Sequence, residues 1–135
     1  MNSVVEIHDS MLAGITSFGR DLVLCLAPAY IHRSAGQPGI DYGSGWLQDL
    51  HLVIFDAVVE FLPSELPIAL SDGSFWVGGV LWDNTIPLPL AVLGAVTLTA
   101  VTSRGERLAV RGAGASVVTR GELRYVEVYP GSTDA

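Results

Sequence analysis

The stretch "AVTLTAVTSRGERLAVR", residues 95–111, decides the fold class of this 135-residue chain. In its first part, Val, Leu and Ala alternate with Thr, Thr and Val, which is the two-residue period of a β-strand with one buried face. The triplet Arg104–Glu106 follows, and its glycine can adopt left-handed backbone geometry without steric cost. Because "RLAVR" then resumes the strand pattern, the stretch predicts an antiparallel hairpin.

Strand patterns and turn signals recur along the rest of the chain. Residues 21–27 and 50–61 are strand-like, a second "RGE" triplet lies at residues 120–122, and Asp72-Gly73 is expected to be a two-residue hairpin tip. No window has the 3.6-residue apolar period of a convincing helix. We therefore predict an all-β fold in a single domain over residues 1–135. It is an antiparallel β-sandwich or a partly closed β-barrel of about eight or nine strands.

The charge of the chain excludes two classes of partner. Its formal net charge is −7, and its seven cationic residues are all arginine. A negative surface field repels phosphate, so we expect no nucleic acid and no anionic membrane as partner. The apolar stretch of residues 86–101 contains two prolines and is shorter than the roughly 20 residues of a membrane-spanning helix. Since the first ten residues also lack the pattern of a signal peptide, a cytoplasmic protein is expected.

Two of the three histidines, His8 and His32, are expected to lie close together. A turn at Gly19–Asp21 would pair the strand before it with the strand after it. In that register His8 lies opposite His32, or opposite Ile31 if the loop holds only two residues, and opposite Cβ atoms are about 4.5–5.5 Å apart. A bulge near Gly14 would shift this register by one residue.

The sequence contains no specific catalytic or cofactor motif. There is no H-x-H or H-E-x-x-H ligand pair, no G-x-S-x-G elbow and no G-x-x-x-x-G-K-[ST] phosphate loop. Two histidines with a carboxylate are a known ligand set for zinc or non-haem iron, and His8, His32 and Asp41 could form one, or His51 could replace Asp41. No cofactor is favoured, the metal is left open, and the motifs do not indicate an enzyme.

The long loop Ser34–Gly45 is the best place for a binding site. Hairpin connections usually hold two to five residues, and longer loops on a rigid scaffold often carry binding residues. Aromatic side chains with polar tips, which recognition surfaces favour, flank this loop. The candidate ligand- or partner-binding residues are His8, Tyr30, His32, Asp41, Tyr42, Trp46 and Gln48. The alternative is that Tyr42 and Trp46 only fix the loop to the fold.

These observations predict a small binding or protein-interaction module. Its partner is expected to be another protein or a second copy of the chain. A small ligand is the alternative. Residues 84–90, "NTIPLPL", fit an edge strand with one apolar side, because proline cannot donate to a sheet ladder. The alternative function is a ligand-pocket β-barrel or a metal-dependent enzyme that uses a cluster of His8, His32 and Asp41.

Overall fold

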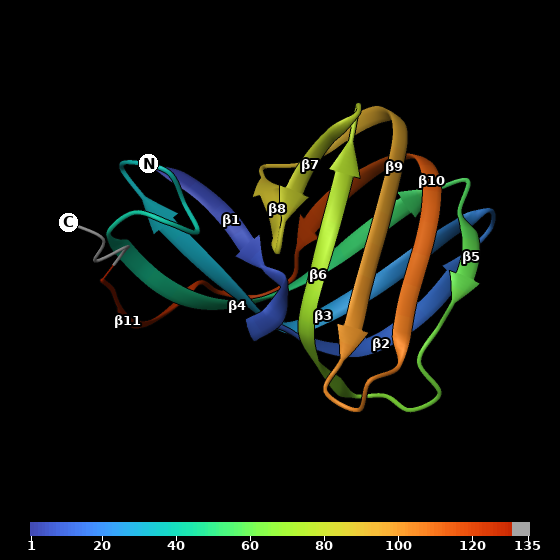
Figure 1. Ribbon diagram of the computed structural model, residues 1–135, viewed down its shortest axis with the longest axis horizontal. Coiled ribbons are helices and arrows are strands. Elements are labelled where there is room, and N and C mark those ends of the chain that lie inside the picture. Colours follow the sequence, from blue (N-terminus) through green and yellow to red (C-terminus); the bar gives the residue numbers. More distant parts are fainter. Residues whose placement is uncertain (131–135) are drawn as a thin grey trace.

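The computed structural model describes residues 1–130, almost all of them in antiparallel β-strands or short connections (Figure 1); residues 131–135 of the predicted domain lie outside that range. Eleven strands belong to one sheet, and the only helical element within residues 1–130 is a 3-10 turn, η1 (Ile7–Asp9). The strands are β1 (Asn2–Glu6), β2 (Met11–Phe18), β3 (Asp21–Ser34), β4 (Gly43–Phe55), β5 (Val58–Phe61), β6 (Ile68–Val77), β7 (Val80–Asp83), β8 (Thr85–Leu88), β9 (Ala91–Thr102), β10 (Arg107–Thr119) and β11 (Arg124–Tyr129). The predicted all-β antiparallel class is confirmed. Eleven strands exceed the expected eight or nine because β1, β5, β7 and β8 have only four or five residues each.

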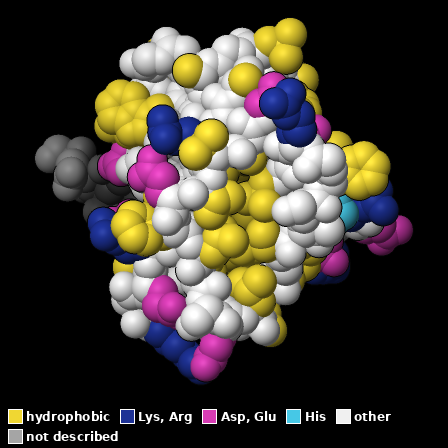
Figure 2. Space-filling model, turned by 90° about the vertical axis from the view of Figure 1, so that its right-hand side faces the viewer, with side chains coloured by type: hydrophobic (Ala, Val, Ile, Leu, Met, Phe, Trp, Pro, Cys, Tyr) yellow, Lys and Arg dark blue, Asp and Glu magenta, His cyan; other side chains and the backbone are white. Residues whose placement is uncertain are grey.

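Six of the strands are hydrogen-bonded in a ring, in the order β4-β10-β9-β6-β2-β3 and back to β4. The ring is only partly closed, because β2 and β6 are joined by just two pairs, Met11↔Ala69 and Leu12↔Ile68. Alternate side chains of these strands point inward. The buried side chains of the interior include Leu24, Leu52, Ile54, Phe75, Leu98 and Val110. On the face drawn in Figure 2, hydrophobic side chains gather in a central hollow surrounded by polar and charged ones.

Strands β3 and β4, of 14 and 13 residues, extend beyond the ring toward the left of Figure 1. Their register shifts between Leu26 and Ala29, where Pro28 has no amide hydrogen for the ladder. Beyond this point β1 and β8 add on one side and β11 on the other, which gives the order β8-β1-β3-β4-β11. We call these five segments the wing: residues 2–6, 29–34, 43–48, 85–88 and 124–129.

Two of the predicted turns, both "RGE" triplets, lie between strands, and the one predicted at Asp72-Gly73 does not form. The triplets at residues 104–106 and 120–122 lie between strands as expected, although β11 pairs with β4 and not with β10. The hairpin tip predicted at Asp72-Gly73 is wrong, because this dipeptide lies inside β6. Its glycine passes so close to β9 that a Cβ would lie 2.7 Å from the Thr99 carbonyl oxygen. The tip is at Gly78-Gly79, whose φ angles of +57° and +78° suit residues without a side chain.

The hairpin between β2 and β3 has the loop and the bulge that the sequence predicts. Phe18 pairs with Asp21, so the loop holds two residues, and the register shifts next to Gly14. A ladder continued from this hairpin would have brought His8 to β3. Instead β2 begins at Met11, so the ladder stops before it reaches the histidine.

The predicted pairing of His8 with His32 is therefore wrong. β1 pairs with β3 separately, and the residue opposite His32 is Val4. His8 lies in η1, which connects β1 to β2. The Ser10 hydroxyl stabilises this connection, because it donates to the Glu6 carbonyl oxygen at 2.7 Å and accepts an amide hydrogen of β3 at 3.0 Å. These hydrogen bonds hold a turn where a regular ladder was expected.

The long loop and the proline-containing edge strand form as predicted. β3 ends at Ser34 and β4 begins at Gly43, which leaves residues 35–42 as the loop. β8 pairs with β1 and lies at one end of the strand order. Within residues 1–130, no helix has the length and apolar character needed to cross a membrane.

Candidate functional site

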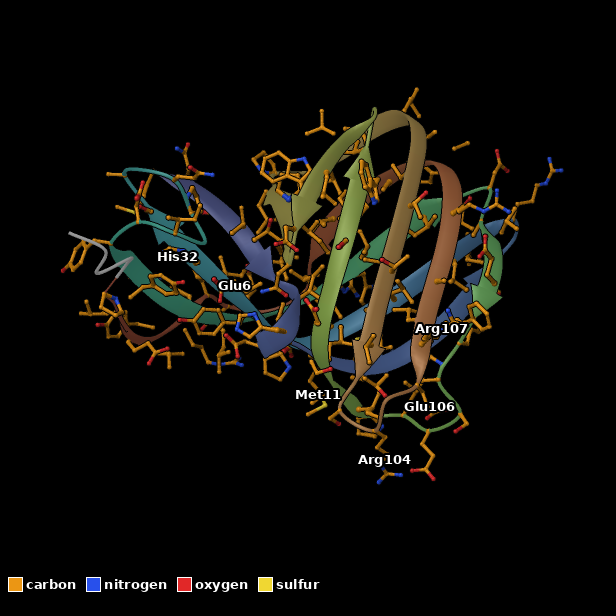
Figure 3. The ribbon with its side chains drawn as sticks, viewed as in Figure 1. Glu6, Met11, His32, Arg104, Glu106 and Arg107 are labelled. Carbon is orange, nitrogen blue, oxygen red and sulfur yellow. The ribbon has the colours of Figure 1, made fainter. Side chains whose placement is uncertain are left out.

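One face of the wing carries a row of polar side chains from three strands. Two of them, Glu6 and His32, are labelled in Figure 3. Glu6 of β1 pairs with Tyr30 of β3, and His32 follows two residues later on the same face. β4 places glycines next to this row, and β11 adds Glu127 and Tyr129 on the far side of β4. We call Glu6, Tyr30, His32, Glu127 and Tyr129 the polar face.

The glycines of β4 make room for the polar face. Gly45 lies opposite His32, and a Cβ on Gly45 would be 2.0 Å from the Tyr30 hydroxyl oxygen. A Cβ on Gly43 would be 1.9 Å from the Arg33 carbonyl oxygen and 3.0 Å from His32 Nε2. Because a glycine has no Cβ, the rings of Tyr30 and His32 can lie against the backbone of β4.

His32 is completely buried and holds the loop against the wing. Its ring stacks on Tyr129 with 3.7 Å between the ring centroids, and its Nδ1 accepts the Gly39 amide hydrogen. The Tyr129 hydroxyl donates to the Gly39 carbonyl oxygen at 3.1 Å. Burial lowers the pKa of His32 more than the nearby Asp41 raises it, which favours the neutral ring. Since Nδ1 is an acceptor, Nε2 carries the hydrogen, and Nε2 has no hydrogen-bond partner within residues 1–130.

We expect His32 to remain neutral in the pH range where an exposed histidine titrates, because burial disfavours the charged ring. Nitrogen-15 NMR of histidine-labelled protein between about pH 8 and pH 5 should report one His32 ring with its hydrogen on Nε2 throughout. At pH values below about 6.5, the folding stability should decrease, because the unfolded chain takes up a proton on this ring and the folded chain does not. A His32 ring that titrates near 6.5 would contradict the burial described above.

Two phenols of the polar face act as hydrogen-bond donors. The Tyr30 hydroxyl donates to Glu127 Oε1 at 2.9 Å. Burial and the Glu127 carboxylate raise the pKa of Tyr30, and burial and the carboxylates of Glu6 and Asp9 raise the pKa of Tyr129. Both hydroxyl groups therefore stay protonated at neutral pH, which suits them to fix neighbouring groups in place.

Glu6 is the acid of the polar face whose pKa is shifted toward neutral pH. Its side chain is buried, with the residue only 3% exposed, and this burial raises its pKa from the usual 4.5 to about 7. The nearby His8 opposes this rise, whereas the hydrogen bond to Asp9 and the charge of Asp9 add to it. Near neutral pH the Glu6 carboxyl is therefore only partly ionised.

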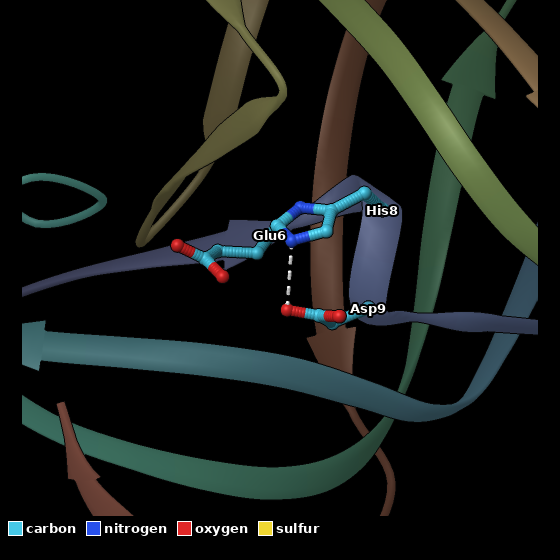
Figure 4. A group of neighbouring side chains, drawn as sticks. All are labelled: Glu6, His8 and Asp9. Atoms are coloured by element: carbon cyan, nitrogen blue, oxygen red, sulfur yellow. Dashed lines mark ion pairs between the residues drawn. The ribbon is translucent and has the colours of Figure 1, made fainter.

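Glu6, His8 and Asp9 place donor atoms within 4.8 Å of one another, a spacing that a metal ion could bridge (Figure 4). The hydrogen bonds around His8 favour another arrangement. Asn84 Oδ1 accepts the His8 amide hydrogen at 2.9 Å, which leaves the Asn84 amide NH₂ facing His8 Nδ1. Nδ1 is then an acceptor, and Nε2 carries the hydrogen that it donates to Asp9 Oδ2 at 3.0 Å. With both ring nitrogens engaged, His8 has no free lone pair for a metal, and the three residues form a hydrogen-bonded network.

A groove of about 830 Å³ lies beside the polar face, between the loop and the β7–β8 connection. Glu6 lines it from β1, and Trp82 lines it from β7. The other polar residues of the lining include Asn2, Gln37, Asp83, Asn84 and Thr85. This volume falls within the roughly 300–1,000 Å³ that is typical of small-molecule sites.

The opposite face of the wing is aromatic. Trp46 of β4 contacts Tyr125 of β11 edge to face, with 5.3 Å between ring centroids, and the Arg33 guanidinium carbon lies 5.4 Å from the Trp46 ring centroid. Tyr125 and Val128 are 56% and 51% exposed on this face. Within residues 1–130, β11 pairs only with β4, so its outer edge is open. We call this outer edge, with Tyr125, Val126 and Val128, the β11 margin.

Four of the seven predicted site residues lie in or beside these surfaces. Tyr30 and His32 belong to the polar face, and His8 lies next to it in η1. Trp46 lies on the opposite face of the same sheet. A register that alternates side chains between the two faces of a sheet cannot bring Trp46 and His32 to one site.

The other three predicted residues have contacts within the loop and its surroundings. Asp41 Oδ2 accepts a loop amide hydrogen at 2.6 Å, and Tyr42 is 67% exposed. The Gln48 side chain donates to a carbonyl of the β10–β11 connection at 2.9 Å. The metal cluster of His8, His32 and Asp41, which was the alternative prediction, is not formed, because the one group of three close ligands found within residues 1–130 contains neither His32 nor Asp41.

Sequence reasoning missed Glu6, Glu127, Tyr129 and Asn84. Glu6 gave a usable signal, since it stands in "VVEI" among apolar residues and was therefore a candidate buried acid. Glu127 and Tyr129 gave none, because nothing local indicates that β11 pairs with β4. No family model, no curated protein and no solved structure matches this chain.

Proposed function

We propose that the chain is a protein-interaction module that pairs with a second copy of itself through β11. The β11 margin carries the proposal, because Tyr125, Val126 and Val128 are 56%, 45% and 51% exposed beside an unpaired strand edge. An exposed apolar edge strand is a template for another strand. Pairing there would continue the sheet into the second copy and cover these side chains, and the expected assembly is a two-fold dimer.

The other end of the sheet is protected from such pairing, which supports β11 as the interface. β8 is only four residues long and contains Pro87, and Pro89 follows it. A proline cannot donate a backbone hydrogen bond, and short strands with prolines are a common protection of sheet edges. β11 has six residues and no proline.

The sequence of β11 is complementary to itself when two copies run antiparallel. One register sets Arg124 opposite Glu127 of the partner subunit, and the two-fold axis repeats this pair. Arg124 and Glu127 point to the same face of the sheet, because the register with β4 shifts between Tyr125 and Glu127. Each opposite-charge pair of this kind contributes about 0.2–1 kcal/mol.

Arg124→Glu is expected to weaken the dimer about tenfold or more, because it replaces two attractive pairs with two repulsive ones. Sedimentation equilibrium at low salt measures the dimer dissociation constant, and added salt should reduce the difference between parent and variant. Combining Arg124→Glu with Glu127→Arg restores opposite charges and should recover association. Val126→Lys places a charge in the middle of the margin and should also weaken the dimer.

The control is Arg120→Glu, which makes the same charge change in the β10–β11 connection outside the strand. It should leave the dissociation constant within about twofold of the parent value. A parent protein that stays monomeric at about 100 µM contradicts the proposal. So does an Arg120→Glu variant that weakens association as much as Arg124→Glu.

A further inference from the structure

The groove beside the polar face is lined by acids without compensating cations. Glu6 and Asp83 contribute carboxyl groups, and the part of the lining that residues 1–130 provide contains no arginine, lysine or histidine. The chain as a whole has a formal net charge of −7. An anionic ligand would meet a field of its own sign, so the groove selects for neutral or positively charged molecules.

The remaining lining fits a molecule with one charged end and one apolar end. Trp82 offers an indole ring, which is an apolar surface for the uncharged part of such a molecule. In the same lining, Asn2 and Gln37 offer side-chain amide oxygens to the hydrogens of an ammonium or guanidinium group. Glu6 lines the same groove and is 3% exposed, so a charge bound beside it would be attracted more strongly than in open water.

We propose that this groove binds a small organic cation, an alkylammonium or alkylguanidinium group, with its charge against Glu6 and its apolar part against Trp82. The groove is lined by residues of β1, the loop, β7, the β7–β8 turn and β8, and by none of β11. The groove and the β11 margin therefore use different residues, and each proposal has its own test and can fail without the other.

The proton on Glu6 is linked to the binding of this cation. The titratable groups that face Glu6 are His8 and Asp9 from η1, Tyr30 from β3 and Tyr129 from β11, while β8 places Thr85 opposite it. Burial raises the Glu6 pKa to about 7, so the empty site holds a proton on this carboxyl below neutral pH. A bound cation stabilises the carboxylate and releases the proton, so affinity should rise with pH as Glu6 ionises.

NMR titration with n-butylammonium and n-butylguanidinium tests the site, with n-butanol as the uncharged molecule of matched chain length. Both cations should shift the Trp82 indole N–H signal saturably, and n-butanol should bind at least about tenfold more weakly. The affinity of both cations should increase up to about tenfold from pH 5.5 to pH 6.5 and change little above pH 8. Equal binding of n-butanol and the cations would overturn the proposal.

The Glu6→Gln variant should weaken cation binding at least about tenfold and remove its pH dependence, because the amide keeps the shape of the acid without its charge. The matched control is Glu122→Gln, which removes an exposed acid of the β10–β11 connection and should leave binding unchanged. A second variant, Asp83→Asn, changes an exposed residue of the lining and should weaken cation binding about two- to fivefold. It tests the same groove if the Glu6→Gln variant does not fold. Parent-like affinity in both Glu6→Gln and Asp83→Asn would overturn the proposal.

The same guanidinium group occurs in free alkylguanidines and in the arginine side chains of peptides, so the titration has a second arm. Nα-acetyl-arginine amide presents the side chain between two peptide bonds. Binding as tight as that of n-butylguanidinium supports a peptide arginine as the natural ligand. Binding of n-butylguanidinium alone supports a free cation. A lack of saturable binding for all the cations overturns the proposal.

Discussion

The Gly43→Ala variant is expected to lose about 3 kcal/mol of its unfolding free energy. A Cβ on Gly43 would lie 1.9 Å from the carbonyl oxygen of Arg33 and 2.9 Å from its carbonyl carbon. These are backbone atoms of the neighbouring strand, so no side-chain rotation can relieve the contact. The same Cβ would lie 3.0 Å from His32 Nε2, where the buried ring has no space to move. Strands β3 and β4 would therefore have to separate at the end of the wing that is next to the loop.

The matched control for this variant is Gly14→Ala in β2. Its Cβ would meet only Cys25 Cβ at 3.9 Å, which is an ordinary van der Waals distance. Alanine also lowers the entropy of the unfolded chain, so the change at Gly14 should stay within about 1 kcal/mol of the parent. Urea unfolding of both variants measures the difference. If Gly43→Ala lowers the unfolding free energy no more than Gly14→Ala does, the close approach of β3 and β4 at Gly43 is contradicted.

The glycines also show why the strands could be predicted and some connections could not. Alternating apolar residues and the "RGE" triplets are local signals, and they placed β9, β10 and the turn between them. Asp72-Gly73 and Gly78-Gly79 are both good turn dipeptides when read alone. The choice between them is made by the pairing of β6 with β9, which extends from Leu70 to Val77 and leaves no room for a tip at Asp72. That pairing joins residues about 25 positions apart, and no local pattern reports it.

The candidate site could be predicted in part for the same reason. Tyr30 and His32 were found because they flank a long loop that is visible in the sequence. Their partners Glu127 and Tyr129 come from the end of the chain, after a crossover from β10 to the far side of β4. The displacement of His8 from the ladder also depends on a distant contact, the hydrogen bond that joins the β1–β2 connection to β3.

The second large effect is expected for Glu6→Gln, which should stabilise the fold at high pH. The Glu6 pKa is about 7 in the folded chain, against 4.5 for an ordinary glutamate, so folding favours the protonated acid. The stability that this proton supplies is fully present below about pH 4.5 and is lost as pH rises through about 7. The glutamine amide offers a donor toward Asp9, as the protonated acid does, and it does not ionise. Glu6→Gln should therefore be more stable than the parent by up to about 3 kcal/mol at pH 8.

The pH profile separates this charge effect from a change in packing. Unfolding free energies of parent and variant, measured by urea from about pH 4 to pH 8.5, should differ least below pH 4.5 and diverge between pH 5 and pH 7.5. The lowered pKa of His32 adds the opposite slope below about pH 6.5, but it is common to both proteins and cancels in their difference. The exposed Glu122→Gln variant should give a nearly flat difference. A constant difference for Glu6→Gln at every pH would mean that Glu6 acts through packing alone, and the proton linkage assigned to the groove would then fail with it.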